Sequence, residues 1–111
     1  MMEPMDILEQ IKQTHHENPI VLYMKGTPTF PQCGFSGRAV QVLRACGLTD
    51  KDYLAVNVLM DQAINEGIRQ YVNWPTFPQL YLKDELIGGS DIMLELYEKG
   101  ELQKLIAAAR Q

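Results

Sequence analysis

Cysteine is scarce in this chain, because its 111 residues include only Cys33 and Cys46. Two cysteines cannot build the disulfide framework of a small secreted domain, so the composition favours a reducing compartment. Long apolar runs are also missing, and the acidic start of the chain, residues 1–6, contains no stretch typical of a signal peptide or a membrane span. We therefore expect a cytoplasmic protein that does not associate with a membrane.

Basic residues are few as well. Lys and Arg number 10 against 14 Asp and Glu, which gives a formal net charge of −4, and they form no basic cluster. This balance argues against nucleic-acid binding. With 46% hydrophobic and 22% charged residues, the chain has the composition of an ordinary globular protein, and its length predicts a single domain over residues 1–111.

What the chain does contain is an alternation of helix and strand patterns. Apolar residues recur at helical spacing in several segments, and short apolar runs bounded by turn residues are typical of strands. Strands separated by helices form parallel pairs, whereas the closing hairpin adds antiparallel strands, so we expect an α/β fold with a four-stranded mixed sheet and helices on both faces. The expected helices span about 6–16, 34–46, 61–72, 90–99 and 101–109, and the expected strands span 20–25, 53–58, 79–82 and 85–87.

Helical spacing also predicts which side chains face the core. In the second helix, Phe35 falls on the same face as the apolar residues at positions 39, 42, 43 and 46. In the last helix, Leu105 is expected to be buried together with residues 102 and 106. The fourth helix is expected to begin after an N-cap at Ser90 or Asp91, because both side chains can accept backbone N–H bonds.

Cys33 stands where a loop passes into a helix. The loop, residues 26–32, is rich in Gly and Pro, and the apolar run before it predicts a buried strand. The first turn of a helix presents unpaired N–H groups and partial positive charge, which stabilise a thiolate. Cys33 is therefore the candidate reactive residue, and it falls beyond the carboxyl end of a central strand, where such folds bind ligands.

Ser36 occupies the place where a Cys-x-x-Cys motif would have its second cysteine. Cys33 can form a mixed disulfide or bind a soft metal, but it needs further sulfur ligands or a resolving thiol from elsewhere. Cys46 cannot supply one, because about 13 helical residues put the two cysteines roughly 20 Å apart, beyond the limit of about 7 Å for a disulfide. Cys46 is expected to be a small core residue.

Other candidate residues have plainer interpretations. His15 and His16 are adjacent, and neighbouring residues on a helix point about 100° apart, so the two rings cannot easily chelate one ion and are expected to be structural or solvated. Lys25 is either a solvated strand end or a ligand contact beside the loop. The side chains of Trp74 and Phe77 are expected in the core.

Four short motifs carry a resemblance to a known family. They are residues 25–28 (Lys-Gly-Thr-Pro), 33–36 (Cys-Gly-Phe-Ser), 74–80 (Trp-Pro-Thr-Phe-Pro-Gln-Leu) and 88–91 (Gly-Gly-Ser-Asp). With these motifs in this order, nearly the whole chain resembles the single-domain, bacterial-like monothiol glutaredoxins of the Cys-Gly-Phe-Ser type. The resemblance implies a thioredoxin-like fold, a mixed sheet flanked by about five helices.

The resemblance also implies roles for individual residues. Cys33 would be the reactive cysteine and an iron–sulfur cluster ligand. A helix N-terminus can bind the γ-glutamyl carboxylate of glutathione, and a carboxylate beside it can bind the ammonium group. The glutathione contacts implied are Lys25 for the glycine carboxylate, the backbone of Phe77 before a cis Pro78 for the cysteinyl part, and Ser90 with Asp91 for the γ-glutamyl end.

Two positions depart from the family pattern. The family usually has an Arg early in the helix before Trp74, which reinforces Lys25 on the carboxylate, and that place is Asn65 here. Arg69, one turn later, matches a family Lys and is a partial substitute. Ser90 stands where the family often has a second cysteine, so one possible resolving thiol is missing.

Ligand counting leads from these residues to a function. A [2Fe–2S] cluster takes four ligands, typically thiolates. Two copies of Cys33 and two glutathione thiolates complete the set, which predicts a homodimer that transfers a labile cluster to apo iron–sulfur client proteins. The resemblance implies BolA-like proteins as partners that replace one subunit. The alternative is a glutathione-dependent oxidoreductase that removes glutathione from protein mixed disulfides through Cys33, and both remain open because they use the same pocket. A redox-inert interaction module would leave Cys33 unexplained.

Overall fold

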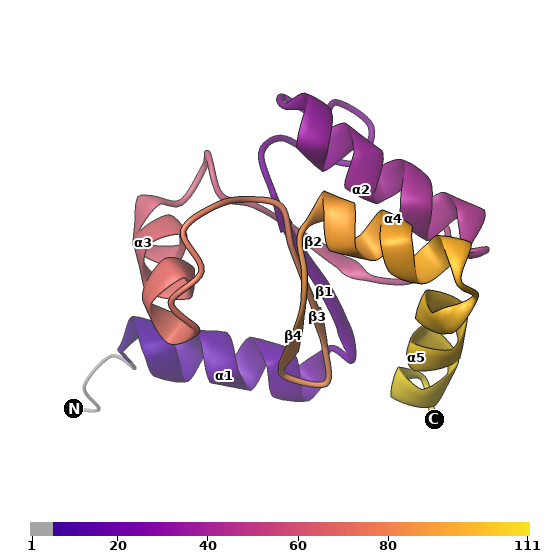
Figure 1. Ribbon diagram of the computed structural model, residues 1–111. Coiled ribbons are helices and arrows are strands. Elements are labelled where there is room, and N and C mark those ends of the chain that lie inside the picture. Colours follow the sequence, from indigo (N-terminus) through magenta and orange to yellow (C-terminus); the bar gives the residue numbers. More distant parts are fainter. Residues whose placement is uncertain (1–5) are drawn as a thin grey trace.

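The computed structural model describes residues 6–111 of the chain (Figure 1). The expected order of helices and strands is confirmed, and the element bounds differ from the expected ones by only a few residues. The expectation about the acidic start of the chain concerns residues 1–6, of which 1–5 lie outside the described residues. The helices are α1 Ile7–Glu17, α2 Gly34–Ala45, α3 Gln62–Tyr71, α4 Ser90–Glu98 and α5 Glu101–Ala109, and the strands are β1 Ile20–Met24, β2 Leu54–Asn57, β3 Gln79–Leu82 and β4 Glu85–Gly88.

The strands form one mixed four-stranded sheet, as predicted, and their order is β2-β1-β3-β4. Strand β1 is parallel to β2 and antiparallel to β3, and β4 returns antiparallel to β3. Figure 1 shows α1 and α3 on one face of the sheet and α2 and α4 on the other. The parallel strands end together, with Met24 in register with Asn57. The loop to α2, and with it Cys33, begins beyond this end of the sheet.

Each face of the sheet has its own core. Under α2, α4 and α5, the fully buried side chains include Leu22, Leu43 and Leu102. Under α1 and α3 they include Tyr23 and Ile68. Successive residues of a strand point to opposite faces, and all five residues of β1 are buried, so this strand contributes to both cores. The carboxyl end of β1 is therefore anchored from both sides.

Gly67 lies inside α3, where glycine lowers helix stability by roughly 1 kcal/mol relative to alanine. The packing explains its presence. A Cβ atom at this position would lie 2.8 Å from Cγ1 of Ile7 and 3.2 Å from Cδ1 of Ile11, both on α1. The missing side chain thus lets α1 and α3 approach each other over the sheet.

His15 is buried between α1 and the sheet, with 2% of its surface exposed. One ring nitrogen lies 2.8 Å from the Tyr23 hydroxyl and the other lies 2.8 Å from Oδ1 of Asp84, in the β3–β4 turn. The Tyr71 hydroxyl donates to the same carboxylate oxygen at 2.7 Å. Burial lowers the pKa of His15 and outweighs the opposite effect of Asp84. His15 is thus structural and His16 is exposed, which agrees with the roles predicted for the pair.

Three expectations about the helices are wrong. Phe35 is 56% exposed and Leu105 is 41% exposed. Phe35 lines a groove in front of the sheet instead of packing beneath α2, and the packing of α5 on α4 and β3 leaves the Leu105 side chain partly uncovered. Helix α4 has its N-cap at Gly89 rather than at Ser90 or Asp91. A Cβ atom on Gly89 would lie 3.3 Å from the Pro78 carbonyl oxygen, so a small residue suits this helix start.

None of the helices within residues 6–111 is long and apolar enough to cross a membrane.

Candidate functional site

Cys33 is the N-cap residue of α2, with an extended backbone and a partly exposed side chain. The backbone N–H of Ser36 is the largest cause that lowers the pKa of the Cys33 thiol, and partial burial opposes it. The N–H of Phe35, the positive charge of Lys25 and the Ser36 hydroxyl lower this pKa further. The helix start therefore favours the thiolate, which is the effect predicted from the loop-to-helix transition.

Cys46 lies at the opposite end of α2, as its C-cap. Its side chain is half-buried and packs against the core under α2, and this burial raises the pKa of its thiol. The two cysteines thus have opposite character, since only Cys33 is both accessible to the groove and favoured as a thiolate.

Ser36 is fully buried, with 0% of its surface exposed. Its Oγ accepts a hydrogen bond from the backbone N–H of Lys25 at 3.0 Å. This bond joins the first turn of α2 to the chain immediately after β1. The serine in the fourth place of the motif therefore fixes the helix start that carries Cys33 against the end of the central strand.

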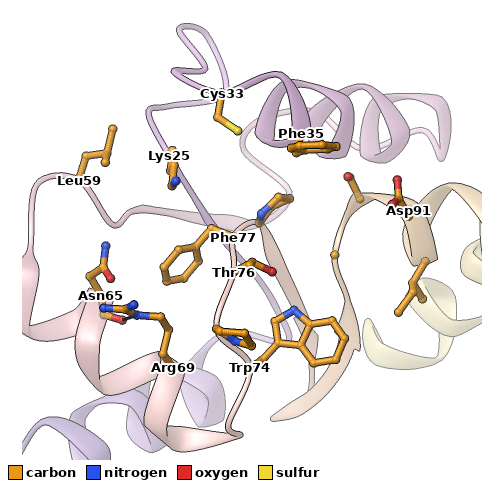
Figure 2. Close-up of a pocket in the computed structure, with 15 residues that line it drawn as sticks. Lys25, Cys33, Phe35, Leu59, Asn65, Arg69, Trp74, Thr76, Phe77 and Asp91 are labelled. Atoms are coloured by element: carbon orange, nitrogen blue, oxygen red, sulfur yellow. Dashed lines mark hydrogen bonds between the residues drawn. The ribbon is translucent and has the colours of Figure 1, made fainter.

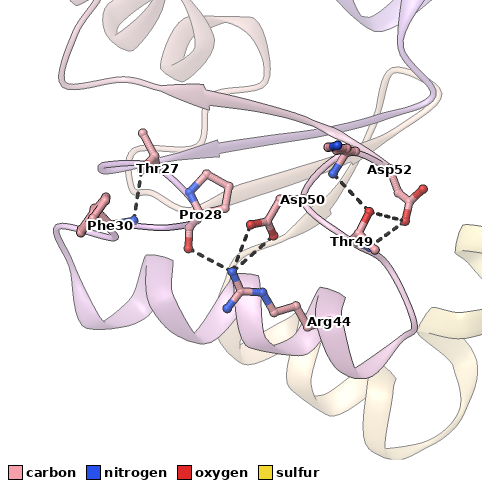
Figure 3. Close-up of polar contacts among 8 residues, drawn as sticks. Thr27, Pro28, Phe30, Arg44, Thr49, Asp50 and Asp52 are labelled. Carbon is pink, nitrogen blue, oxygen red and sulfur yellow. Dashed lines mark hydrogen bonds and ion pairs between the residues drawn. The ribbon is translucent and has the colours of Figure 1, made fainter.

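The loop before Cys33 is held in a fixed shape. Gly26 adopts a φ of 91°, and a Cβ atom there would lie 2.5 Å from the Phe30 carbonyl oxygen, so only glycine fits. Figure 3 shows Arg44, on α2, donating to the Pro28 carbonyl oxygen at 3.3 Å and pairing with Asp50 at 3.1 Å. The loop is thus tied to the helix that follows it.

A groove with a volume of about 850 Å³ opens beside Cys33 (Figure 2). It is built from the end of β1, the start of α2, the loop after β2, helix α3, the loop before β3 and the start of α4. It brings together the predicted site residues, although they come from five separate parts of the chain. The lining residues are Lys25, Cys33, Phe35, Leu59, Asn65, Arg69, Trp74, Pro75, Thr76, Phe77, Pro78, Gly89, Ser90, Asp91 and Ile92.

One end of the groove carries positive charge from Lys25 and Arg69. Within residues 6–111 neither of these side chains forms an ion pair, so both charges are available to a ligand. Asn65 stands beside them, and its Nδ2 donates to the Val58 carbonyl oxygen at 3.3 Å. Arg69 Nε donates to the Asn65 carbonyl oxygen at 3.2 Å, which keeps the base of this side chain against α3.

The start of α4 forms the other end of the groove. Gly89 has no side chain to cap the helix, so the first N–H groups of α4 have no side-chain acceptor. Ser90 is nearly buried, whereas the Asp91 side chain is 82% exposed. Arg38 approaches Asp91 at 3.4 Å, and an exposed pair of this kind is worth little. This end therefore offers anion-binding N–H groups next to a carboxylate.

Residues 74–78 form the floor of the groove, and the Phe77–Pro78 peptide bond is cis. The Phe77 side chain is 9% exposed and packs into the core under α1 and α3, as expected. Trp74 was also expected in the core, but it is only half-buried and lines the groove.

Sequence reasoning missed several residues of the groove. Leu59 follows the carboxyl end of β2, so the rule that ligands lie beyond such strand ends could have identified it. Leu59 and its neighbour Met60 are exposed to 53% and 81%, and Phe30, in the loop before Cys33, is exposed to 72%. Thr76 lies in the motif at residues 74–80 but was assigned no role, and Ile92 carries no signal of its own, because only the folded chain brings it to the groove.

These features define the class of protein: a thioredoxin-like fold in which a thiol with a lowered pKa lies at a helix start beside a cis-proline loop. The family model for glutaredoxin matches residues 20–87. The chain belongs to the glutaredoxin family, and its motif Cys33-Gly34-Phe35-Ser36 places it among the monothiol members.

The relatives agree with this assignment. Glutaredoxin 4 from Escherichia coli strain K12 is 50% identical over 99 residues, which cover 89% of this chain and 84% of that protein. The solution structure of reduced poplar apo GrxS14 is 40% identical and has a TM-score of 0.77 over 92% of this chain and 91% of that one. A monomeric truncated mutant of Trypanosoma brucei 1-C-Grx1 is 33% identical, with a TM-score of 0.80 over 96% and 93% of the two chains.

Proposed function

We propose that this protein carries a [2Fe–2S] cluster between two copies of the chain and passes it to apo iron–sulfur proteins. The observation that carries the proposal is the thiol of Cys33, favoured as a thiolate and placed beside a groove that can bind a carboxylate at each end. The cluster is the cargo of the protein, and glutathione is its co-ligand.

The groove suits glutathione, which has two carboxylates, one ammonium group and a central thiol. Lys25 and Arg69 would bind the glycine carboxylate, and the open N-terminus of α4 would bind the γ-glutamyl carboxylate. Asp91 would accept the ammonium group, and the backbone of Phe77 would pair with the cysteinyl part. The glutathione thiol then lies in front of Cys33.

The donor set fits a shared cluster. Residues 6–111 contain no group of three or more His, Cys, Asp or Glu side chains able to hold a metal ion. A [2Fe–2S] cluster takes four ligands, so Cys33 from each of two chains and two glutathione thiolates complete the set. Because half of these ligands are small molecules that can dissociate, the cargo is labile, which suits transfer by ligand exchange.

Exposed apolar side chains near Cys33 support the proposed homodimer. Phe30, Phe35, Leu59 and Met60 are each more than half exposed, and two of them line the groove itself. Burying such side chains against a second copy contributes favourable free energy. The same surface would receive a BolA-like protein in place of one subunit, and a reducing cytoplasm would keep Cys33 free for the cargo.

The lowered pKa of Cys33 also favours a second function, glutathione-dependent thiol–disulfide exchange. The Cys33 thiolate would attack the glutathione sulfur of a mixed disulfide, and the client thiolate would leave and take up a proton. A second glutathione thiolate would then attack the Cys33–glutathione disulfide, releasing oxidised glutathione and the Cys33 thiolate. One thiol suffices for this cycle.

Anaerobic reconstitution separates the two functions. The protein is incubated with iron and sulfide, with and without glutathione, and then analysed by visible absorbance and size-exclusion chromatography. A carrier should become coloured only with glutathione and shift from monomer to dimer. Cys33→Ser should abolish both changes, whereas Cys46→Ala should lower stability alone. Rapid reduction of a glutathionylated peptide by a protein that never retains iron would instead support the exchange enzyme.

A further inference from the structure

Gln79 is a buried polar residue that the proposed function does not use. It is the first residue of β3, lies opposite Tyr23 of β1, and has 0% of its surface exposed. A buried amide destabilises a protein unless its polar atoms are hydrogen-bonded. The partners of Gln79 therefore indicate why a glutamine lies beneath the floor of the groove.

The amide of Gln79 holds the loop that precedes it. Its Nε2 donates to the Trp74 carbonyl oxygen at 2.9 Å and to the Thr76 carbonyl oxygen at 3.1 Å. Its Oε1 accepts from the hydroxyl of Tyr81 at 2.9 Å. One side chain thus bonds to two carbonyls of the groove floor.

Tyr81 fixes the direction of this amide. Burial raises the pKa of the Tyr81 hydroxyl, so that the O–H remains protonated and available as a donor. Carbonyl oxygens only accept, so the two loop carbonyls require the NH₂ side of Gln79. A flipped amide would put Oε1 against both carbonyls. The arrangement therefore has one satisfied orientation.

This orientation determines where the Phe77 N–H points. The only cis peptide bond within residues 6–111 is Phe77–Pro78, so the bond between Thr76 and Phe77 is trans. In a trans peptide the C=O and the N–H point in opposite directions. Because the Thr76 C=O points to Gln79, the Phe77 N–H points away from it. Within residues 6–111 this N–H donates to no other group, and Phe77 lines the groove.

We propose that Gln79 is a positioning residue that turns the Phe77 N–H toward a peptide carbonyl bound in the groove, and that Tyr81 locks Gln79 in this role. The inference rests on the proposed binding of glutathione. The buried Gln79 side chain would thus set the direction of the Phe77 N–H, a backbone donor in a loop that is otherwise partly exposed.

The test compares glutathione binding by calorimetry for the full chain and three variants. Gln79→Met keeps the size of the side chain but removes both donors, and it should weaken binding about tenfold because one ligand hydrogen bond is lost. Tyr81→Phe should weaken binding about two- to threefold, since only the lock is removed. Gln103→Met, a half-buried glutamine on α5 outside the groove, should bind like the original chain.

Two further readouts separate positioning from a merely structural role. The Cys33 thiol pKa, followed by thiolate absorbance, should stay unchanged in all variants, because α2 and Lys25 set it. The Phe77 amide signal in nuclear magnetic resonance should shift on glutathione addition in the original chain and shift much less in Gln79→Met. Should Gln79→Met fail to fold, Tyr81→Phe takes its place, and its Phe77 signal is also expected to shift less on glutathione addition than in the original chain.

Two negative results have different meanings. A lack of glutathione binding by the original chain would refute the proposed function. The positioning role alone would be overturned if folded Gln79→Met binds glutathione as tightly as the original chain and shows the same Phe77 shift. If only Tyr81→Phe folds, the same result in that variant has the same meaning.

Discussion

Replacing Ser36 by Ala tests the role of the fourth motif position. Ser36 is fully buried, and its Oγ accepts the Lys25 N–H at 3.0 Å. Alanine removes only this oxygen and leaves the Lys25 N–H without its partner. An unsatisfied buried donor costs about 1–3 kcal/mol, so we expect a loss of about 2 kcal/mol in the free energy of unfolding. For a chain of this length, the melting temperature should fall by about 8 °C.

Thr27→Ala provides the matched control. The Thr27 hydroxyl oxygen also accepts a backbone N–H, that of Phe30, at 3.1 Å, but this bond is exposed. Water can replace the lost acceptor there, so the free energy of unfolding should change by less than about 0.5 kcal/mol. The difference between Ser36→Ala and Thr27→Ala therefore measures the effect of burial on the same kind of bond.

The same variant tests the origin of the Cys33 thiolate. The largest cause of its lowered pKa is the Ser36 backbone N–H, which alanine retains, and the hydroxyl is the smallest cause. Ser36→Ala should therefore keep the pKa of Cys33 below its ordinary value. Urea unfolding, calorimetric melting and thiolate absorbance provide the measurements. Equal destabilisation by Ser36→Ala and Thr27→Ala would refute the buried tie, and a Cys33 pKa back at its ordinary value would refute the backbone origin.

Three further predictions follow from buried or charged groups. The fold lowers the pKa of His15, so as the pH falls below 6.5 this histidine should take up a proton in the unfolded chain before it does so in the folded one. The free energy of unfolding should therefore fall with falling pH. His15→Gln should flatten this pH dependence in urea titrations. Gly67→Ala should lower the free energy of unfolding by about 1–3 kcal/mol, because its methyl group would crowd Ile7. Gly34→Ala is the control: a Cβ there meets nothing within 4 Å, so this variant should have the melting temperature of the original chain. Equal melting temperatures of the two variants would contradict the close packing of α1 and α3. Lys25→Met should weaken glutathione binding at least about tenfold in calorimetry, and an unchanged affinity would move the carboxylate contact elsewhere.

The sequence was sufficient for the fold and for the place of Cys33 at the start of α2, because both depend on local signals. Alternating strand and helix patterns define the order of elements, and a loop that enters a helix defines the environment of Cys33. The cis bond at Pro78 was implied by the resemblance of the motif at residues 74–80 to the glutaredoxin family. These features need no knowledge of distant contacts.

Tertiary contacts account for what the sequence could not provide. Helical spacing identifies the apolar face of α5 but not whether another element covers it, so Leu105 was wrongly placed in the core. His15 finds its partner Asp84 at a distance of 69 residues along the chain. The role of Gln79 depends on carbonyl directions in a folded loop, which no residue pattern specifies.

The opposite pKa shifts of the two cysteine thiols allow one of them to be labelled selectively. An alkylating dye reacts with thiolates, so at limiting dose near neutral pH it should modify Cys33 and spare Cys46, whose thiol is harder to ionise. A fluorophore could thus be attached at the mouth of the groove in the unaltered chain. Its fluorescence emission would then follow the binding of a partner protein to this surface over time.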